Sequence, residues 1–170
     1  MDAKVCAAMI AMSLNLTPVQ TGFATLAFKT AEAQIITFDG CVDSRGIRVA
    51  SVLRPGLGDV AKSTLDSKGR PVILYDPMVL SWFHPQTRLF WYAHECAHHA
   101  LGHLIGSTFP LLVEEEADCW GIKTLYKRGI LSDADVKVVE HDISKLPFSD
   151  WMHLPGPLRA INLKLCLALS

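Results

Sequence analysis

"FWYAHECAHHALGH", residues 90–103, places four histidines, one glutamate and one cysteine within fourteen positions of a chain that has seven histidines in all. The stretch belongs to a segment whose apolar residues recur at helical spacing from about Pro85. On an α-helix, His94 and His98 lie one turn apart and only about 40° apart around the axis, so their imidazoles can reach one ion. Glu95 lies about 100° from His94, close enough to contact a water on that ion. We therefore expect one helix that presents two metal ligands and a potential base.

The pattern H-E-x-x-H has a defined chemistry. Two neutral imidazoles hold zinc, and the glutamate takes a proton from water on the metal and delivers it to the leaving amine of a peptide bond. Cys96 and His103 lie about 200° and about 180° from His94 around the helix, so neither is expected to join the same metal. His99 and His103 are expected to be polar residues at the helix margin. The pattern thus predicts Zn²⁺ as the cofactor.

A third ligand is expected from a second helix, because a catalytic zinc site uses three protein ligands and leaves one position open for water. The sequence "EEEAD", residues 114–118, follows His98 after a gap of 15 residues. Glu114 and Asp118 share one helix face at i, i+4, so if Glu114 binds the metal, Asp118 can hold a ligand histidine from behind. Glu115 is the alternative ligand, although it would break the relation to Asp118. A structural zinc site would instead fill all four positions with cysteine and histidine.

The HExxHH motif at residues 94–99 and the ExxAD motif at residues 114–118 resemble the gluzincin metallopeptidases of the HtpX and CAAX-prenyl-endopeptidase family, in particular its small soluble members. The resemblance covers roughly residues 70–160. It implies a zinc-dependent endopeptidase with His94 and His98 among the metal ligands. The chain differs from the HtpX-like members in lacking their multiple membrane spans.

A third segment, "HLPGPLR" at residues 153–159, adds to the resemblance. It supplies His153 and Arg159 at the family's spacing, although Leu154 stands where the family usually has proline. The resemblance implies that His153 and Arg159 stabilise the tetrahedral oxyanion and order the active site, which cationic or hydrogen-donating groups can do. It also implies that the strand "VILYD", residues 72–76, runs along the cleft and pairs through its edge with an extended substrate.

The remaining patterns predict an α+β fold. "GIRVASVL" (46–53) and "RPVILYDP" (70–77) have the β-branched content of strands, and residues 60–75 are expected to form a hairpin that ends at Tyr75. Helical patterns extend to Gly129, restart at Ser132, and return after Pro155-Gly156-Pro157. We expect a helical hairpin carrying the zinc site, packed on a small antiparallel β-sheet, as in a minimal zincin-like gluzincin.

The N-terminus has the features of an export signal. Between Lys4 and Lys29 the chain runs 24 residues without a charge, and Ala31-Glu32-Ala33 follows as a small-x-small cleavage signal. Polar residues and a proline interrupt the apolar run, which makes a retained membrane anchor a poor one. We expect residues 1–33 to be a signal peptide and 34–170 a single metallopeptidase domain that is periplasmic or secreted. An uncleaved anchor and a buried N-terminal helix are the alternatives.

Removal of residues 1–33 would leave four cysteines, Cys41, Cys96, Cys119 and Cys166. An oxidising compartment could pair this even set in three ways, among which the sequence does not choose. Four buried free thiols are the alternative if the chain stays in the cytosol, since cysteine is often buried.

Charge and length limit the possible partners. The 170 residues suit one compact domain, and 16 basic against 17 acidic residues give no electrostatic footprint for nucleic acid or an anionic membrane. The expected function is a zinc-dependent metalloendopeptidase acting on peptide or unfolded protein, with no stable membrane span after signal cleavage. The alternatives are a zinc-bearing module that binds a peptide or partner without cleaving it, and a metal-free interaction domain whose histidines are incidental.

Overall fold

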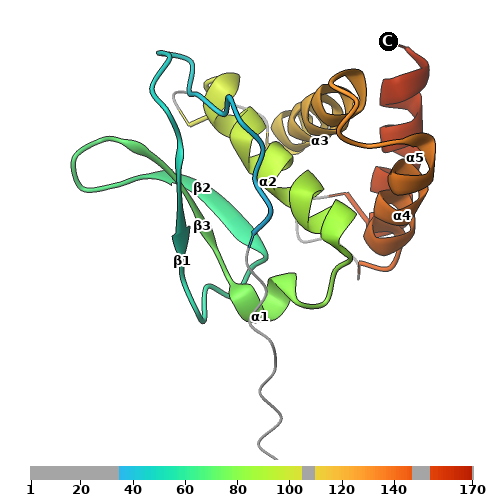
Figure 1. The fold of residues 1–170 in the computed structure, drawn as a ribbon, viewed down its shortest axis with the longest axis horizontal. Coiled ribbons are helices and arrows are strands. Elements are labelled where there is room, and N and C mark those ends of the chain that lie inside the picture. Colours follow the sequence, from blue (N-terminus) through green and yellow to red (C-terminus); the bar gives the residue numbers. More distant parts are fainter. Residues whose placement is uncertain (1–34, 105–109, 147–153, 170) are drawn as a thin grey trace, which may run out of the picture.

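A small β-sheet lies on one side of the molecule and a group of helices on the other, with α2 between them (Figure 1). The computed structural model describes residues 35–104, 110–146 and 154–169, so the predicted signal peptide and His153 lie outside the described residues. The elements in chain order are β1 (Ala50–Leu53), β2 (Ala61–Leu65), β3 (Pro71–Tyr75), α1 (Pro77–Leu80), α2 (Pro85–Ala100), α3 (Pro110–Lys127), α4 (Asp133–Ser144) and α5 (Gly156–Ala168). The α+β class is confirmed.

The three strands form a mixed sheet in the order β1-β3-β2. β2 and β3 pair antiparallel, with Ser63 opposite Ile73, which confirms the predicted hairpin ending at Tyr75. β1 pairs parallel to β3, with Ser51 opposite the same Ile73. The prediction of a wholly antiparallel sheet is therefore wrong, because the last strand of the hairpin inserts between the first two.

Asp76, which directly follows β3, binds the loop between β1 and β2. Its carboxylate accepts hydrogen bonds from the backbone N–H groups of Gly56 (2.8 Å) and Leu57 (3.0 Å), in the loop between β1 and β2. It also accepts from the N–H of Met78 and so caps the short helix α1, which the sequence patterns did not predict. A side chain at the end of β3 is thus bonded to a loop about 20 residues earlier in the chain, a contact that turn residues alone do not reveal.

The central position of β3 follows from its composition. Four of its five residues are buried, whereas all four residues of β1 are exposed. The prediction that "VILYD" (72–76) offers its edge to a substrate is wrong, because β3 is hydrogen-bonded to a strand on each side. Within the described part of the chain, β1 and β2 are the outer strands of the sheet, and β2 contacts α2 more extensively than β3 does (Figure 1).

Helix α2, which carries the metal motif, lies at the centre of the core. Its buried surface is wider than the single apolar stripe that the sequence predicts. Every residue from Leu89 to His99 is buried. The sheet packs on one side of α2, and α3 and α4 pack on others. Because polar groups are costly to bury without partners, each polar side chain in this stretch needs a partner inside the protein.

The other helices begin and end close to the predicted positions. α3 stops at Lys127, before Gly129, whose φ of +66° suits a helix end. Ser132 caps α4 and forms a reciprocal capping box with Asp135, as the start predicted at Ser132 requires. Among the described residues, no helix combines the length and apolar character needed to cross a membrane.

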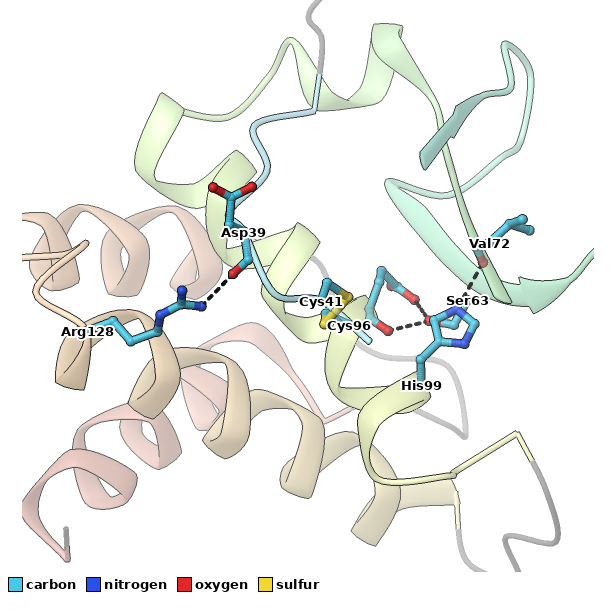
Figure 2. Close-up of a disulfide and its surroundings, with 8 residues drawn as sticks. Asp39, Cys41, Ser63, Val72, Cys96, His99 and Arg128 are labelled. Atoms are coloured by element: carbon cyan, nitrogen blue, oxygen red, sulfur yellow. Dashed lines mark hydrogen bonds between the residues drawn. A yellow bond between two sulfur atoms is a disulfide. The ribbon is translucent and has the colours of Figure 1, made fainter. Parts of the chain in front are cut away.

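The four cysteines pair as Cys41–Cys96 and Cys119–Cys166, one of the three pairings that the sequence allowed. Figure 2 shows the first disulfide joining the segment before β1 to α2.

Two further contacts hold the segment before β1. The guanidinium of Arg128 donates a hydrogen bond to the Asp39 carbonyl at 2.8 Å (Figure 2). The N–H of Ser44 donates to the carbonyl of His99 at 3.0 Å. The segment is therefore attached both to the metal-motif helix and to the residue that follows α3.

Loss of the second disulfide should lower stability without changing the fold. Cys119 and Cys166 are 47 residues apart in sequence, so their cross-link restricts the unfolded chain substantially. In the double variant Cys119→Ala/Cys166→Ala, the free energy of unfolding should fall by about 3–4 kcal/mol. Urea denaturation followed by circular dichroism measures this difference. A loss below about 1 kcal/mol would contradict a stabilising role.

Candidate metal centre

Three side chains converge at one point between α2 and α3. The Nε2 atoms of His94 and His98 lie 3.2 Å apart. The carboxylate of Glu114 places Oε2 3.1 Å from His94 Nε2 and Oε1 3.5 Å from His98 Nε2. Ligands at about 2.0–2.1 Å from a tetrahedral zinc ion are about 3.3 Å from each other. Among the described residues, these three could therefore hold one metal ion.

Close packing of two helices brings the ligands together. His94 and His98 come from consecutive turns of α2, and Glu114 comes from α3. At Gly121 of α3 a Cβ atom would lie only 3.2 Å from the backbone nitrogen of His94 and 3.3 Å from the carbonyl carbon of Ala93. Any larger residue there would require the two helices to shift by a few tenths of an ångström, so glycine suits this close approach. The alternative ligand, Glu115, is not part of the cluster.

Asp118 lies behind His94, as its i, i+4 relation to Glu114 predicted. The Nδ1–H of His94 donates to Asp118 at 2.8 Å, which leaves Nε2 directed at the cluster. Both side chains are buried. Although burial by itself would raise the pKa of Asp118, the guanidinium of Arg159 holds that pKa well below its usual range. Asp118 is therefore ionised and keeps a proton on Nδ1 of His94.

The structure places Arg159 on Asp118. Its Nε and one terminal nitrogen donate to the two carboxylate oxygens at 2.8 and 2.6 Å, and its guanidinium lies 5.1 Å from the centre of the Trp91 ring. The side chain is buried. A direct role of Arg159 at the oxyanion stays a prediction, as does the role of His153, which lies outside the described residues.

The candidate base Glu95 is buried beside β2. Burial raises the pKa of its carboxyl group, against the opposing effect of His94. The hydroxyl of Ser63 lies within hydrogen-bonding distance of the Glu95 carboxylate and 2.9 Å from its backbone carbonyl. Ser63 was not predicted, because a serine in a short strand has no pattern that links it to a helix 32 residues away.

His99 and His103 are outside the cluster, as predicted, but neither is a loosely held polar residue. The Nε2–H of His99 donates to the Val72 carbonyl of β3 at 3.0 Å (Figure 2), and burial lowers the pKa of His99. His103 lies against His98 and Glu116. The first contact anchors α2 to the sheet, and the second touches a candidate ligand.

Comparison of the chain with protein-family models, curated proteins and solved structures found no match. The geometry of the site is therefore the basis for any functional conclusion.

Zinc uptake should release one proton. In the metal-free site burial opposes protonation of His94, but hydrogen bonds to the Asp118 and Glu114 carboxylates raise its pKa to about 10. Burial and the nearby His94 lower the pKa of His98 to about 3. At neutral pH the metal-free site thus holds a proton on His94 that zinc must displace, while His98 is already neutral. The apparent zinc affinity should rise about tenfold per pH unit from about pH 6 to about pH 9.

Competition with a chelator of known protonation behaviour, repeated across this pH range, measures that slope. A plateau above about pH 7 would show that His94 titrates near the ordinary histidine value.

Proposed function

We propose that this protein is a zinc-dependent metallopeptidase. The observation that most supports the proposal is the tetrahedral spacing of the His94, His98 and Glu114 ligand atoms, with the Glu95 carboxylate on the adjoining residue. Two imidazoles and one carboxylate form a donor set that suits zinc and leaves a position open. A structural site would have four protein ligands, which is why we favour a hydrolytic role.

Glu95 is the proposed general base. Zinc in such a site supplies a Lewis acid that activates water and polarises a carbonyl group. Glu95 accepts the proton of the attacking water and returns it to the amide nitrogen as the peptide bond breaks. Burial raises the pKa of Glu95, which favours the protonated form that returns the proton, and Ser63 orients the carboxylate.

Arg159 is proposed to act through Asp118. The paired contacts between the two side chains keep Asp118 ionised, and Asp118 in turn orients His94. This is a positioning role, which differs from the direct oxyanion contact implied by the resemblance. His153 remains the proposed donor to the oxyanion.

The proposed substrate is a peptide or an unfolded protein in extended form. β2 is an outer strand of the sheet among the described residues, lies beside α2, and contacts the proposed base through Ser63. A segment of substrate added to this edge would gain backbone hydrogen bonds and pass close to Glu95. The proposed substrate-pairing strand is thus β2 in place of β3.

We further propose that the enzyme is exported and is related to the small soluble gluzincins. Residues 1–33 would be a cleaved signal peptide and 34–170 the metallopeptidase domain, acting in the periplasm or outside the cell. Two disulfides support an oxidising compartment.

Zinc binding should depend on Glu114 and be indifferent to Glu115. Protein produced in an oxidising compartment should contain about one zinc per chain, as expected for a single three-ligand site. Glu114→Ala removes one of the three ligands and should lose the metal, whereas Glu115→Ala is the matched control and should keep it. Elemental analysis after dialysis gives the stoichiometry. A folded wild-type protein that takes up no zinc would refute the proposed metal site.

Replacement of Glu95 by glutamine should separate metal binding from catalysis. Glu95→Gln retains the ligands, so zinc content should stay at the wild-type level, while the rate of peptide hydrolysis should fall at least about 100-fold. The rate is measured by the appearance of new N-termini in an unfolded protein substrate. Wild-type turnover in the variant would exclude Glu95 as the base. A zinc-loaded wild type that binds the substrate without cutting it would instead identify a peptide-binding module.

A further inference from the structure

The end of α2 folds back beneath one of the metal-binding histidines. Gly102 has a φ of +76°, and the N–H groups of His103 and Gly102 donate to the carbonyls of His98 (2.9 Å) and His99 (3.2 Å). These two bonds form a Schellman motif, in which a left-handed glycine ends the helix and reverses the chain. The residue that follows Gly102 is thereby brought back against the last turn of α2.

The reversed chain places the His103 ring on His98. The two Nδ1 atoms are 3.1 Å apart, and the ring centres are 5.2 Å apart at an interplanar angle of 70°. The side chain of His103 is only 8% exposed. Its other nitrogen, Nε2, lies 3.1 Å from Oε2 of Glu116 on α3. His103 therefore bridges the metal-motif helix to the helix that supplies the third ligand.

Metal binding leaves one consistent arrangement of protons in this chain of contacts. His98 directs Nε2 at His94 and Glu114, so that nitrogen must offer its lone pair to the metal. The proton of His98 then lies on Nδ1 and is donated to Nδ1 of His103. A His103 that accepts at Nδ1 has its own proton on Nε2, from which it donates to Glu116.

We propose that His103 is a positioning residue for the metal site, fixing the tautomer and ring orientation of His98 with support from Glu116. His94 has Asp118 as its partner, whereas His98 has His103 at the corresponding nitrogen. Groups that hold the second nitrogen of a metal-bound histidine typically contribute 10–100-fold to metal affinity. Glu116 contributes less, because its side chain is 66% exposed and its charge is screened by solvent. The inference rests on the proposed metal site.

The test compares two variants of the full protein at this position. His103→Leu removes the hydrogen bond while keeping an apolar side chain, and His103→Asn retains a polar atom close to the position of Nδ1. His103→Leu should weaken zinc binding about 10–100-fold in a chelator competition. His103→Asn should keep most of the wild-type affinity. The visible spectrum of the Co²⁺-substituted protein should change in His103→Leu and resemble the wild type in His103→Asn. His141→Leu, at an exposed position on α4, is the control for loss of a histidine.

The outcomes separate this inference from the metal site itself. A wild type that binds no zinc would refute the site. If His103→Leu instead binds zinc as tightly as the wild type and has the same Co²⁺ spectrum, only the role of His103 is overturned. Equal losses in the leucine and asparagine variants would also overturn it, because packing and not hydrogen bonding would then matter.

A measurement on the unaltered protein decides the matter if the variants do not fold. Nuclear magnetic resonance correlations between ring protons and nitrogens in the zinc-bound protein should show the His103 proton on Nε2 and the His98 proton on Nδ1. A His103 protonated on Nδ1 would contradict the proposed arrangement. Glu116→Ala should reduce zinc affinity about two- to fivefold relative to Glu115→Ala, as an exposed partner does.

Discussion

The buried carboxylate of Asp118 holds the helical side of the molecule in register. It lies on α3, accepts a hydrogen bond from His94 of α2, and binds Arg159 of α5 through both oxygens. Removing a carboxylate and a guanidinium from water is costly unless both are paired. Movement of any one of the three helices would leave a buried charge without its partner. The position of the candidate ligand His94 is therefore tied to the packing of three helices.

The burial of α2 explains why so many polar and reactive residues are concentrated in one stretch. Because α2 is enclosed on most sides, each successive side chain meets a different neighbour and needs a chemistry that suits it. His94 and His98 face Glu114, Glu95 faces Ser63 of β2, Cys96 is bonded to Cys41, and His99 donates to Val72 of β3. One helix thus binds the proposed metal and attaches the helices to the sheet and to the N-terminal segment.

Each disulfide has one cysteine that directly follows a residue of the candidate site. Cys96 follows Glu95 along α2, and Cys119 follows Asp118 along α3. Their partners lie in the segment before β1 and in α5, far away in sequence. A domain of this size has a limited core, and cross-links at these positions stabilise the two helices that carry the candidate ligands. The same helices pack closely at Gly121, where a larger side chain would require them to shift by a few tenths of an ångström.

The sequence by itself determined the features that depend on residues near one another in the chain. The i, i+4 spacing identified His94 and His98 as candidate metal ligands, and the register of Glu114 with Asp118 identified the third candidate. Capping and turn residues located the longer helices and the β2–β3 hairpin, but not the short helix α1. Only the tertiary structure decided that β3 is central, that Arg159 lies on Asp118, and which cysteines pair. It alone brought Ser63 to Glu95 and His103 to His98. Helical phase predicts where a side chain points only while the helix continues, and it says nothing about which distant segment packs against it.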